Sequence, residues 1–523
     1  MSESRLRPAV VLVADRTLSA RYRVLFEGIF ATMQTRQVPG PMMRHFLAPP
    51  VGTDRFGRAR TAPLGLRRVE ASLICDAGLA EDDVVCTTPE AIGSLLGPWT
   101  KIVGFSSADP LGKGMSNTTT SNFWKGELYT RYWSRMLLEQ IGAAKKKFGF
   151  KVIGGGAGAW QWLQYKDSTA CDTLDTVFDG YFEEAGPSLI KEMLSGRWAG
   201  GDVCSRGTFA EKIRPIRGAS LMGVVELSRG CGRGCGFCTM AEKKMEHLDA
   251  EVILSDLRTN VAGGVRSAVS GSEDFFRYGA TGIKPDFEKL CSLLEQMRRI
   301  SGLSFMQIDH ANISSVAQLS DQQLGQIRRL LTWEKPTEFL WVNMGAESAS
   351  GALVSANCPG KTAPFRADDW EDLLYATAQR MTKNGYFAVF SIVMGLPGET
   401  GRDVARTLKF VRFLENQRAA VFPVFYEPFR AEQIQAGEGF SLKKFRPDHL
   451  ELLRNCYEIN FRQIPRLFWD NQRAGGVGWL KRAAMQTLGK AEVFSWRRTF
   501  VRIGRRLKEE SLSERNYVPE TVG

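Results

Sequence analysis

The stretch LSRGCGRGCGFCTM, residues 227–240, places three cysteines at the spacing C-x3-C-x2-C. They are Cys231, Cys235 and Cys238, and glycines lie between them. Because glycine has no Cβ, its backbone can turn tightly, so this loop can direct three thiolates toward one centre. The residues just before it, VVELSRG at 224–230, are predicted to form a buried strand that ends where the loop begins.

Soft thiolate ligands are typical of zinc sites and of iron–sulfur clusters. Structural zinc takes four ligands, often as two C-x2-C pairs, and the sequence contains no second pair of this kind. Three thiolates fit three corners of a [4Fe–4S] cube and leave one iron without a protein ligand. We therefore interpret the loop as a cluster-binding loop rather than as a zinc site.

Apolar runs typical of buried strands alternate with helical patterns on both sides of this loop, which predicts α/β folding with parallel sheets. We expect a doubly wound, Rossmann-like domain at 1–200, a partial (β/α)6 barrel at 201–430 and a mainly helical domain at 431–523. The stretch 195–207 is predicted to be a linker. The candidate strands are 9–15, 83–87, 102–107, 150–158 and the start of 176–194, then 224–230, 265–274, 303–309, 339–345, 386–395 and 419–426. In both kinds of sheet, ligands bind at the carboxyl ends of the strands.

The cysteine loop and the segments after it resemble the radical SAM superfamily. The resemblance implies that the open iron binds S-adenosylmethionine (SAM) and that Phe237 lies against its adenine. SGSED at 270–274 ends the second barrel strand, and its Glu273 is expected either to bind the SAM amine or to ligate the open iron. GAES at 345–348 places Glu347 and Ser348 near the ribose. GLPGET at 395–400 places Gly395 at the adenine.

The first domain resembles the cobalamin-binding domain that precedes many radical SAM barrels. The matching segments are GFSS at 104–107, which contains Ser106, the glycines Gly154, Gly155 and Gly156, and FDGYFEE at 178–184. A glycine loop after a strand would also suit NAD or FAD, so a dinucleotide remains the alternative ligand.

The first domain departs from the cobalamin-binding pattern in one respect. It has no Asp-x-His-x-x-Gly motif, so we expect no histidine below the cobalt. The resemblance places Arg67 and Arg68 there instead. The polar stretch 107–133 is predicted to be a loop over the cofactor, with Asp109 and Asn117 as contacts.

Together these features resemble the cobalamin-dependent radical SAM methyltransferases, and most closely those that methylate carbon 2 of tryptophan in thiopeptide antibiotic biosynthesis. The resemblance implies that SAM methylates cobalamin and that methylcobalamin passes the methyl group to L-tryptophan by polar transfer. It also implies an electron donor that reduces cobalamin. A base near the indole nitrogen is required. Glu273, Asp309 and Tyr426 are the expected catalytic residues, with His310, Asn343 and Glu427 as further candidates at strand ends.

Two other functions remain open from the sequence. One is radical methylation or cyclisation of a lipid, tetrapyrrole or peptide, with formation of 5′-deoxyadenosine. The other is RNA modification that uses the basic stretch WRRTFVRIGRRLK at 496–508. The net charge of +12 is spread along the chain, so nucleic acid is not the expected partner.

The composition sets the broad class of the protein. The chain has 523 residues, of which 43% are hydrophobic and 24% are charged, as in folded globular proteins. No apolar run reaches the ~18 residues of a membrane span, so we expect a cytoplasmic protein with no membrane partner. Ten cysteines in a chain without a secretion signal argue against a disulfide framework.

Overall fold

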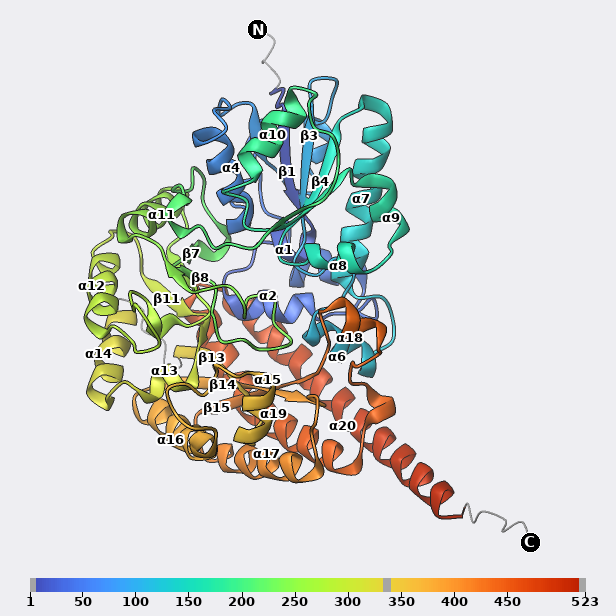
Figure 1. Ribbon diagram of the computed structural model, residues 1–523, viewed down its shortest axis with the longest axis vertical. Coiled ribbons are helices and arrows are strands. Elements are labelled where there is room, and N and C mark those ends of the chain that lie inside the picture. Colours follow the sequence, from blue (N-terminus) through green and yellow to red (C-terminus); the bar gives the residue numbers. More distant parts are fainter. Residues whose placement is uncertain (1–5, 333–339, 517–523) are drawn as a thin grey trace.

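The structure is a computed structural model that describes residues 6–332 and 340–516, in three parts that pack against one another (Figure 1). An N-terminal α/β domain lies above a curved half-barrel, and two long C-terminal helices run along the barrel. The predicted fold class is thereby confirmed. Among the described residues, no helix is both long and apolar enough to cross a membrane.

The N-terminal sheet is parallel and six-stranded, in the order β2-β1-β3-β4-β5-β6. Its strands are β1 (Val10–Ala14), β2 (Val84–Cys86), β3 (Ile102–Ser106), β4 (Lys151–Gly155), β5 (Thr176–Gly180) and β6 (Val203–Ser205). The strand order reverses between β1 and β3, which creates the switch point where such sheets bind ligands. The short strand β6 falls inside the predicted linker, so the sheet continues to Ser205.

Helices cover both faces of this sheet. Helices α4 (Leu64–Cys75) and α10 (Gly186–Leu194) bury Leu66 and Ile190 against one face. Helix α7 (Tyr129–Phe148) buries Leu138 and Ile141 against the other. Each fully buried aliphatic side chain contributes roughly 1.5–3 kcal/mol. The sheet is therefore covered on its faces and open at the carboxyl edge, where ligands bind.

The second part is an open barrel of seven strands in two groups. One group of strands is ordered β11-β10-β7 and the other β12-β13-β14-β15. Only Asp309 separates β11 from β12, so the two groups follow one another around a single curved wall. The strands are β7 (Val224–Glu226), β10 (Ser267–Gly271), β11 (Phe305–Ile308), β12 (His310–Ala311), β13 (Leu340–Glu347), β14 (Tyr386–Met394) and β15 (Ala419–Phe425). The six predicted strands are all present, although Phe339 lies outside the described residues.

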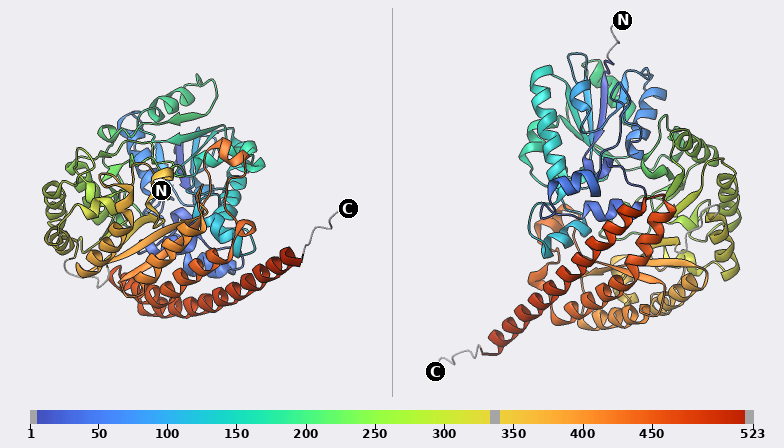
Figure 2. Two further views of the ribbon diagram at one scale, coloured as in Figure 1. Left: turned by 60° about the horizontal axis from the view of Figure 1, so that its bottom comes forward. Right: turned by 180° about the vertical axis from the view of Figure 1, so that it is seen from behind.

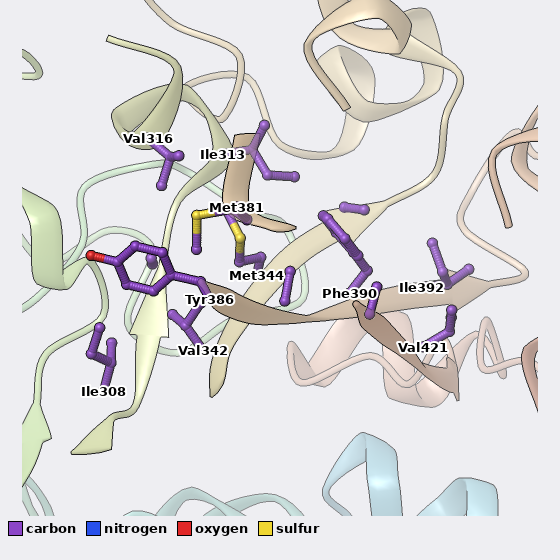
Figure 3. Close-up of a cluster of buried hydrophobic side chains, with 14 of the residues drawn as sticks. Ile308, Ile313, Val316, Val342, Met344, Met381, Tyr386, Phe390, Ile392 and Val421 are labelled. Atoms are coloured by element: carbon purple, nitrogen blue, oxygen red, sulfur yellow. The ribbon is translucent and has the colours of Figure 1, made fainter. Parts of the chain in front are cut away.

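The outer face of the barrel wall carries the largest hydrophobic core (Figure 3). Val342, Met344 and Phe390 point outward from β13 and β14 toward the surrounding helices. The surrounding helices are α11 (Ala250–Ala262), α12 (Phe287–Arg298), α13 (Ile313–Ala317), α14 (Asp321–Leu331), α16 (Trp370–Lys383) and α17 (Gly401–Leu414). The hydroxyl of Tyr386 donates to the carbonyl oxygen of Leu324 at 2.9 Å, which satisfies the polar end of a buried ring.

The lower bore of the barrel is filled by the other two parts of the chain. Trp341 and Phe387 face inward and meet α2 (Leu25–Thr32) of the first domain, with the rings of Phe26 and Trp341 5.6 Å apart. Leu467 of α19 (Pro447–Ala474) completes this cluster. Because each part supplies side chains to one core, the three parts pack as a unit, and only the upper end of the bore is open.

The predicted helical C-terminal region consists mainly of α19 and of α20 (Trp479–Asn516), a long helix whose last turns project from the molecule (Figure 2). The prediction of a loop at 107–133 is wrong in its middle, where Met115–Phe123 form α6. The Thr119 and Thr120 hydroxyls bond back to carbonyls of this helix, and Thr119 also accepts from the backbone of Phe425 at 2.7 Å. Polar side chains are buried here because the helix itself satisfies them.

Buried ion pairs join the first domain to the barrel, and we expect their loss to lower the free energy of unfolding. Arg68 of α4 pairs with Asp256 of α11 at 2.5 Å, and both side chains are almost completely buried. Asp256→Ala should lower the free energy of unfolding by about 3 kcal/mol, because the buried Arg68 then keeps only the carboxylate of Glu226, 3.4 Å away, as a counter-charge. Urea unfolding measures the change. As a control, Glu251→Ala on the same helix removes an exposed pair with Arg258 and should lower the free energy of unfolding by less than about 1 kcal/mol. Equal losses of stability in the two variants would contradict the importance of the buried pair.

Candidate functional site

The cysteine loop lies across the carboxyl end of the barrel. The short strands β8 (Ser228–Arg229) and β9 (Glu246–His247) pair antiparallel and close residues 230–245 into a loop. Gly232 and Gly234 both have a φ of +69°, which a residue with a Cβ rarely adopts. The backbone N–H of Cys231 donates to Lys243 at 3.0 Å, and that of Gly234 donates to Ala241 at 3.1 Å. The loop is therefore folded by its own backbone.

A buried arginine fastens this loop to the barrel. Arg233, which is 2% exposed, donates to the carbonyl oxygens of Gly360 and Ala363 at 3.0 Å each and to the Ser315 hydroxyl at 3.1 Å. The N–H of Gly236 donates to the carbonyl oxygen of Asn357 at 2.8 Å. These bonds place the thiols before any iron binds.

The three thiols fit a cluster of iron and sulfide. Cys231, Cys235 and Cys238 are all half-buried on one glycine-turned loop. Burial raises the pKa of Cys231 to about 11 and that of Cys238 to about 12, so iron has to displace protons from them.

Three ionisable side chains gather at the ends of β10, β11 and β12. Asp309 and His310 form an ion pair, with 3.0 Å between Oδ1 and Nδ1. Burial opposes the charged imidazole, but Asp309 and then Glu273 raise the pKa of His310 to about 9. Burial raises the pKa of Glu273, and the positive charge of His310 counteracts it. The expected catalytic residues Glu273 and Asp309 are therefore neighbours, and the histidine between them is a cation near neutral pH.

A second ion pair lies at the end of β13. Glu347 has a φ of +59° at a β-bulge and pairs closely with the ammonium group of Lys361, and both side chains are buried. The structure does not place Ser348 where the predicted ribose contact requires it. Its hydroxyl is 3.0 Å from that of Thr407 on α17, and the residue is 1% exposed, so it lies on the outer side of the wall, away from the bore. Lys361 was missed, since no motif marks it.

Phe237 and Tyr426 face one another across the mouth of the barrel. Their ring centroids are 6.4 Å apart in an edge-on arrangement. Below them, the N–H of Gly395 donates to Glu399 at 2.9 Å, and Glu399 also lies 2.9 Å from Nε2 of His449 on α19. The C-terminal region thus holds the turn at 395–400 in place.

The first domain turns its carboxyl edge toward this mouth. A cavity of about 210 Å³ lies between its sheet and helices α4 and α10. It is lined mainly by apolar groups, and Ser106, Gly155, Gly156 and Arg68 border it. Gly156 has a φ of +94°, and a Cβ there would lie 2.6 Å from the Ser106 hydroxyl. Gly154 is equally restricted, because its Cβ would lie 2.7 Å from Leu174.

Three predicted contacts of the first domain, Arg67, Asp109 and Asn117, are used within the protein itself. Arg67 binds Glu70 at 2.8 Å and the carbonyl oxygens of Ala59 and Ala219, and it does not border the cavity that Arg68 reaches. Asp109 accepts hydrogen bonds from Asn117, from Gln161 and from two backbone N–H groups. Asp109 and Asn117 therefore shape their own loop.

No sequence motif marks the group of side chains that clamps the first domain to the barrel. Arg229, two residues before the first cysteine of the loop, binds Glu183 with two hydrogen bonds of 2.8 and 2.7 Å and binds Glu226 at 2.7 Å. Its guanidinium lies 4.1 Å from the centroid of the Tyr181 ring. Glu183 and Tyr181 follow β5 of the first domain, so this clamp joins that domain to the base of the cysteine loop.

The sequence model of the radical SAM superfamily matches residues 225–411. These residues form a radical SAM domain. The domain implies a [4Fe–4S] cluster and SAM, and Cys231, Cys235 and Cys238 remain the predicted cluster ligands.

Curated relatives match over the same region at low identity. A ribosomal protein uS12 methylthiotransferase, RimO, of Leptospira biflexa is 22% identical over 236 residues, 45% of this chain and 48% of its own length. A tRNA-2-methylthio-N(6)-dimethylallyladenosine synthase of Desulfosudis oleivorans is 24% identical over 264 residues, 50% of this chain and 53% of its own length. The chain thus spans about half the length of these relatives.

Two solved structures of the radical S-adenosylmethionine methyltransferase TsrM from Kitasatospora setae share the fold. Each superimposes with a TM-score of 0.53 over 82% of this chain, at 13% identity. They cover 76% and 77% of the TsrM chain. One contains tryptophan and a SAM analogue, and the other contains cobalamin and a [4Fe–4S] cluster. At this identity the likeness shows the fold alone.

The assignment of the three cysteines predicts a clean loss of iron. A Cys231, Cys235 and Cys238→Ala triple variant, reconstituted anaerobically with iron and sulfide, should fall from about four irons per chain to almost none, because no thiolate remains on the loop. Iron and sulfide analysis, with electron paramagnetic resonance of the reduced protein, measures this. The matched control replaces the exposed Cys75, Cys171 and Cys204 and should keep its iron. Equal loss of iron from both triple variants would refute the assignment of the three loop cysteines as cluster ligands.

Proposed function

We propose that the protein is a methyltransferase that moves a methyl group from SAM, through cobalamin, to carbon 2 of L-tryptophan. The observation that carries this proposal is the position of the glycine-bordered cavity of the first domain, whose carboxyl edge faces the mouth of the radical SAM domain. Bound cobalamin would carry the methyl group between donor and acceptor. The likeness to TsrM, whose structures contain these ligands, supports the proposal.

The first domain has two features that suit the nucleotide tail of cobalamin, an open switch point and an apolar cavity. Its strand order places Ser106 and Gly156 beside the switch point, where backbone can approach a ligand closely. The apolar cavity of about 210 Å³ suits the nucleotide end of the cofactor rather than the macrocycle. Arg68 and Arg229 are the cations among its lining residues, beside the carboxylates of Glu183 and Glu226, and no histidine is among the residues that line it. An arginine does not readily lose its proton to become a ligand, so the lower face of the cobalt would be weakly coordinated.

The radical SAM domain contains acidic and basic side chains that suit the charged groups of SAM. Glu273 and Glu347 are acceptors for the amine and the ribose, and Lys361 is a cation for the carboxylate. Phe237 and Gly395 border the proposed adenine site. Glu273 remains the candidate for the open iron as well, because its burial beside Asp309 makes a cationic or metal partner favourable.

Asp309 is our candidate for the base that accepts the indole N–H proton. It is half-exposed at the upper end of the bore. His310 can hold its carboxylate in place, as a charge-assisted pair does. The buried ring of Tyr426, which is 2% exposed, packs edge-on against Phe237 and supports that ring at the proposed adenine site. Holding the indole carbon in line with the methyl donor supplies several kcal/mol of the barrier.

A second candidate function is radical-type methylation or cyclisation of another substrate. The match to a methylthiotransferase of a ribosomal protein and to a tRNA-modifying synthase favours it. The two candidates differ in one product, because the radical route releases 5′-deoxyadenosine.

The deciding experiment uses the anaerobically reconstituted protein with hydroxocobalamin, a reductant, L-tryptophan and methyl-labelled SAM. We expect labelled 2-methyltryptophan and S-adenosylhomocysteine, without 5′-deoxyadenosine, by mass spectrometry. Asp309→Asn should lower kcat by about 10²-fold or more, because a positioned base typically contributes that much. Asp368→Asn, an exposed carboxylate on the outer surface, should have no effect.

Other outcomes separate the parts of this proposal. If cluster and cobalamin bind but L-tryptophan gives no product, the substrate is wrong. Formation of 5′-deoxyadenosine would replace the polar route by the second candidate. Failure of cobalamin to bind would refute the role of the first domain.

A further inference from the structure

A second cavity, of about 260 Å³, lies where all three parts of the chain meet, beside β15 on the open side of the barrel. Helices α2 and α6 of the first domain form one side of it, and α20 forms the other. The cysteine loop is not among its lining residues. Aromatic rings dominate its wall, and Trp496 lies within 5.1 Å of the Phe123 and Trp124 centroids and 4.1 Å from that of Tyr457.

The polar groups of the wall are mostly satisfied within the protein. Thr119 and Thr120 donate to the carbonyl oxygens of Met115 and Ser116 at 2.6 and 2.9 Å. Such hydroxyls offer little to ordered water, which needs several polar partners. Glu492 of α20 supplies the one carboxylate at the cavity, and it accepts a hydrogen bond from Trp496. Among the lining residues, all of which the structure describes, none is a lysine or an arginine.

We propose that this cavity binds an apolar aromatic amine, whose rings fill the aromatic wall and whose ammonium group pairs with Glu492. A cavity of about 150 Å³ accommodates benzene, so the larger volume here has room for a bicyclic ring with a short side chain. A free amino acid is a poor ligand, because its carboxylate would be buried without a cation. The site is therefore distinct from any tryptophan site in the barrel mouth and does not rest on the proposed methyl transfer.

The surroundings of Glu492 favour a cationic ligand. Burial raises its pKa to about 7, although a hydrogen bond from Trp496 opposes the shift. An ammonium group would stabilise the ionised carboxylate, and the faces of Trp and Tyr rings attract organic cations. Tyr457 is the other titratable side chain of the wall. Burial and the nearby Glu492 raise its pKa well above the ordinary value, so it stays neutral.

Calorimetric titration of the full-length protein with tryptamine, indole-3-propionate and L-tryptophan tests the proposal, and it needs neither cluster nor cobalamin. We expect tryptamine to bind at least tenfold more tightly than either carboxylate-bearing compound. Glu492→Gln should weaken tryptamine at least tenfold. Glu458→Gln on α19, which removes an exposed carboxylate paired with Arg497, should leave binding unchanged.

A pH series on the unaltered protein covers the case in which the variant does not fold. Tryptamine stays cationic between pH 6 and 8, because alkylammonium groups have a pKa of about 10. Glu492 is ionised above about pH 7 and protonated below it, so tryptamine affinity should fall as the pH is lowered from 8 to 6. Equal binding of amine and acids, or affinity that is independent of pH, would overturn the proposal.

Discussion

The carboxylate of Glu226 holds two buried arginines together where the first domain meets the barrel. It lies at the end of β7, 2.7 Å from Arg229 and 3.4 Å from Arg68. Burial would raise its pKa, but the two guanidinium groups lower it below its ordinary value, so the group is ionised. Arg68 comes from the first domain, and Arg229 precedes the cysteine loop. The relative position of domain, barrel and loop therefore depends on one desolvated charge cluster.

This charge cluster fixes the relative orientation of the first domain and the barrel more than it stabilises the fold. Burying charges costs desolvation energy that their attraction only roughly offsets. Its directional bonds allow one arrangement of the parts, however, and Glu183 adds a bidentate partner for Arg229 from the first domain. The carboxyl edge of the first sheet is thereby fixed opposite the mouth of the barrel, as a reaction between two bound cofactors would require.

Because the barrel is open, its edge strand has to be covered by helices. A closed barrel would have no exposed edge strand, whereas β15 here has α6 beside it and α19 and α20 around it. Helices that cover an edge pack less regularly than neighbouring strands do. The aromatic cavity at Glu492 lies in this seam, and it exists because three separate segments of the chain meet there.

The sequence by itself determined the strands, the cysteine loop and the fold class. Apolar runs of strand length and the C-x3-C-x2-C spacing are local signals, and local signals are read without knowing the neighbours. The sequence predicts Glu273, Asp309 and Tyr426 at strand ends, but it does not predict which side chains each of them contacts. These residues lie far apart in the chain, but parallel strands bring their ends together.

Only the tertiary structure decided which side chains reach the site. The bulge at Gly345 and Glu347 turns Glu347 toward Lys361 and leaves Ser348 on the outer face, and one residue of shift reverses a side chain in a strand. The threonines of α6 are polar in sequence yet buried, because the helix satisfies their hydroxyls. Arg233, Arg229 and Lys361 gain their roles from partners such as Ala363, Glu183 and Glu347, which lie 130, 46 and 14 residues away in the chain. A buried charge is specified by the groups around it, and folding alone brings those groups together.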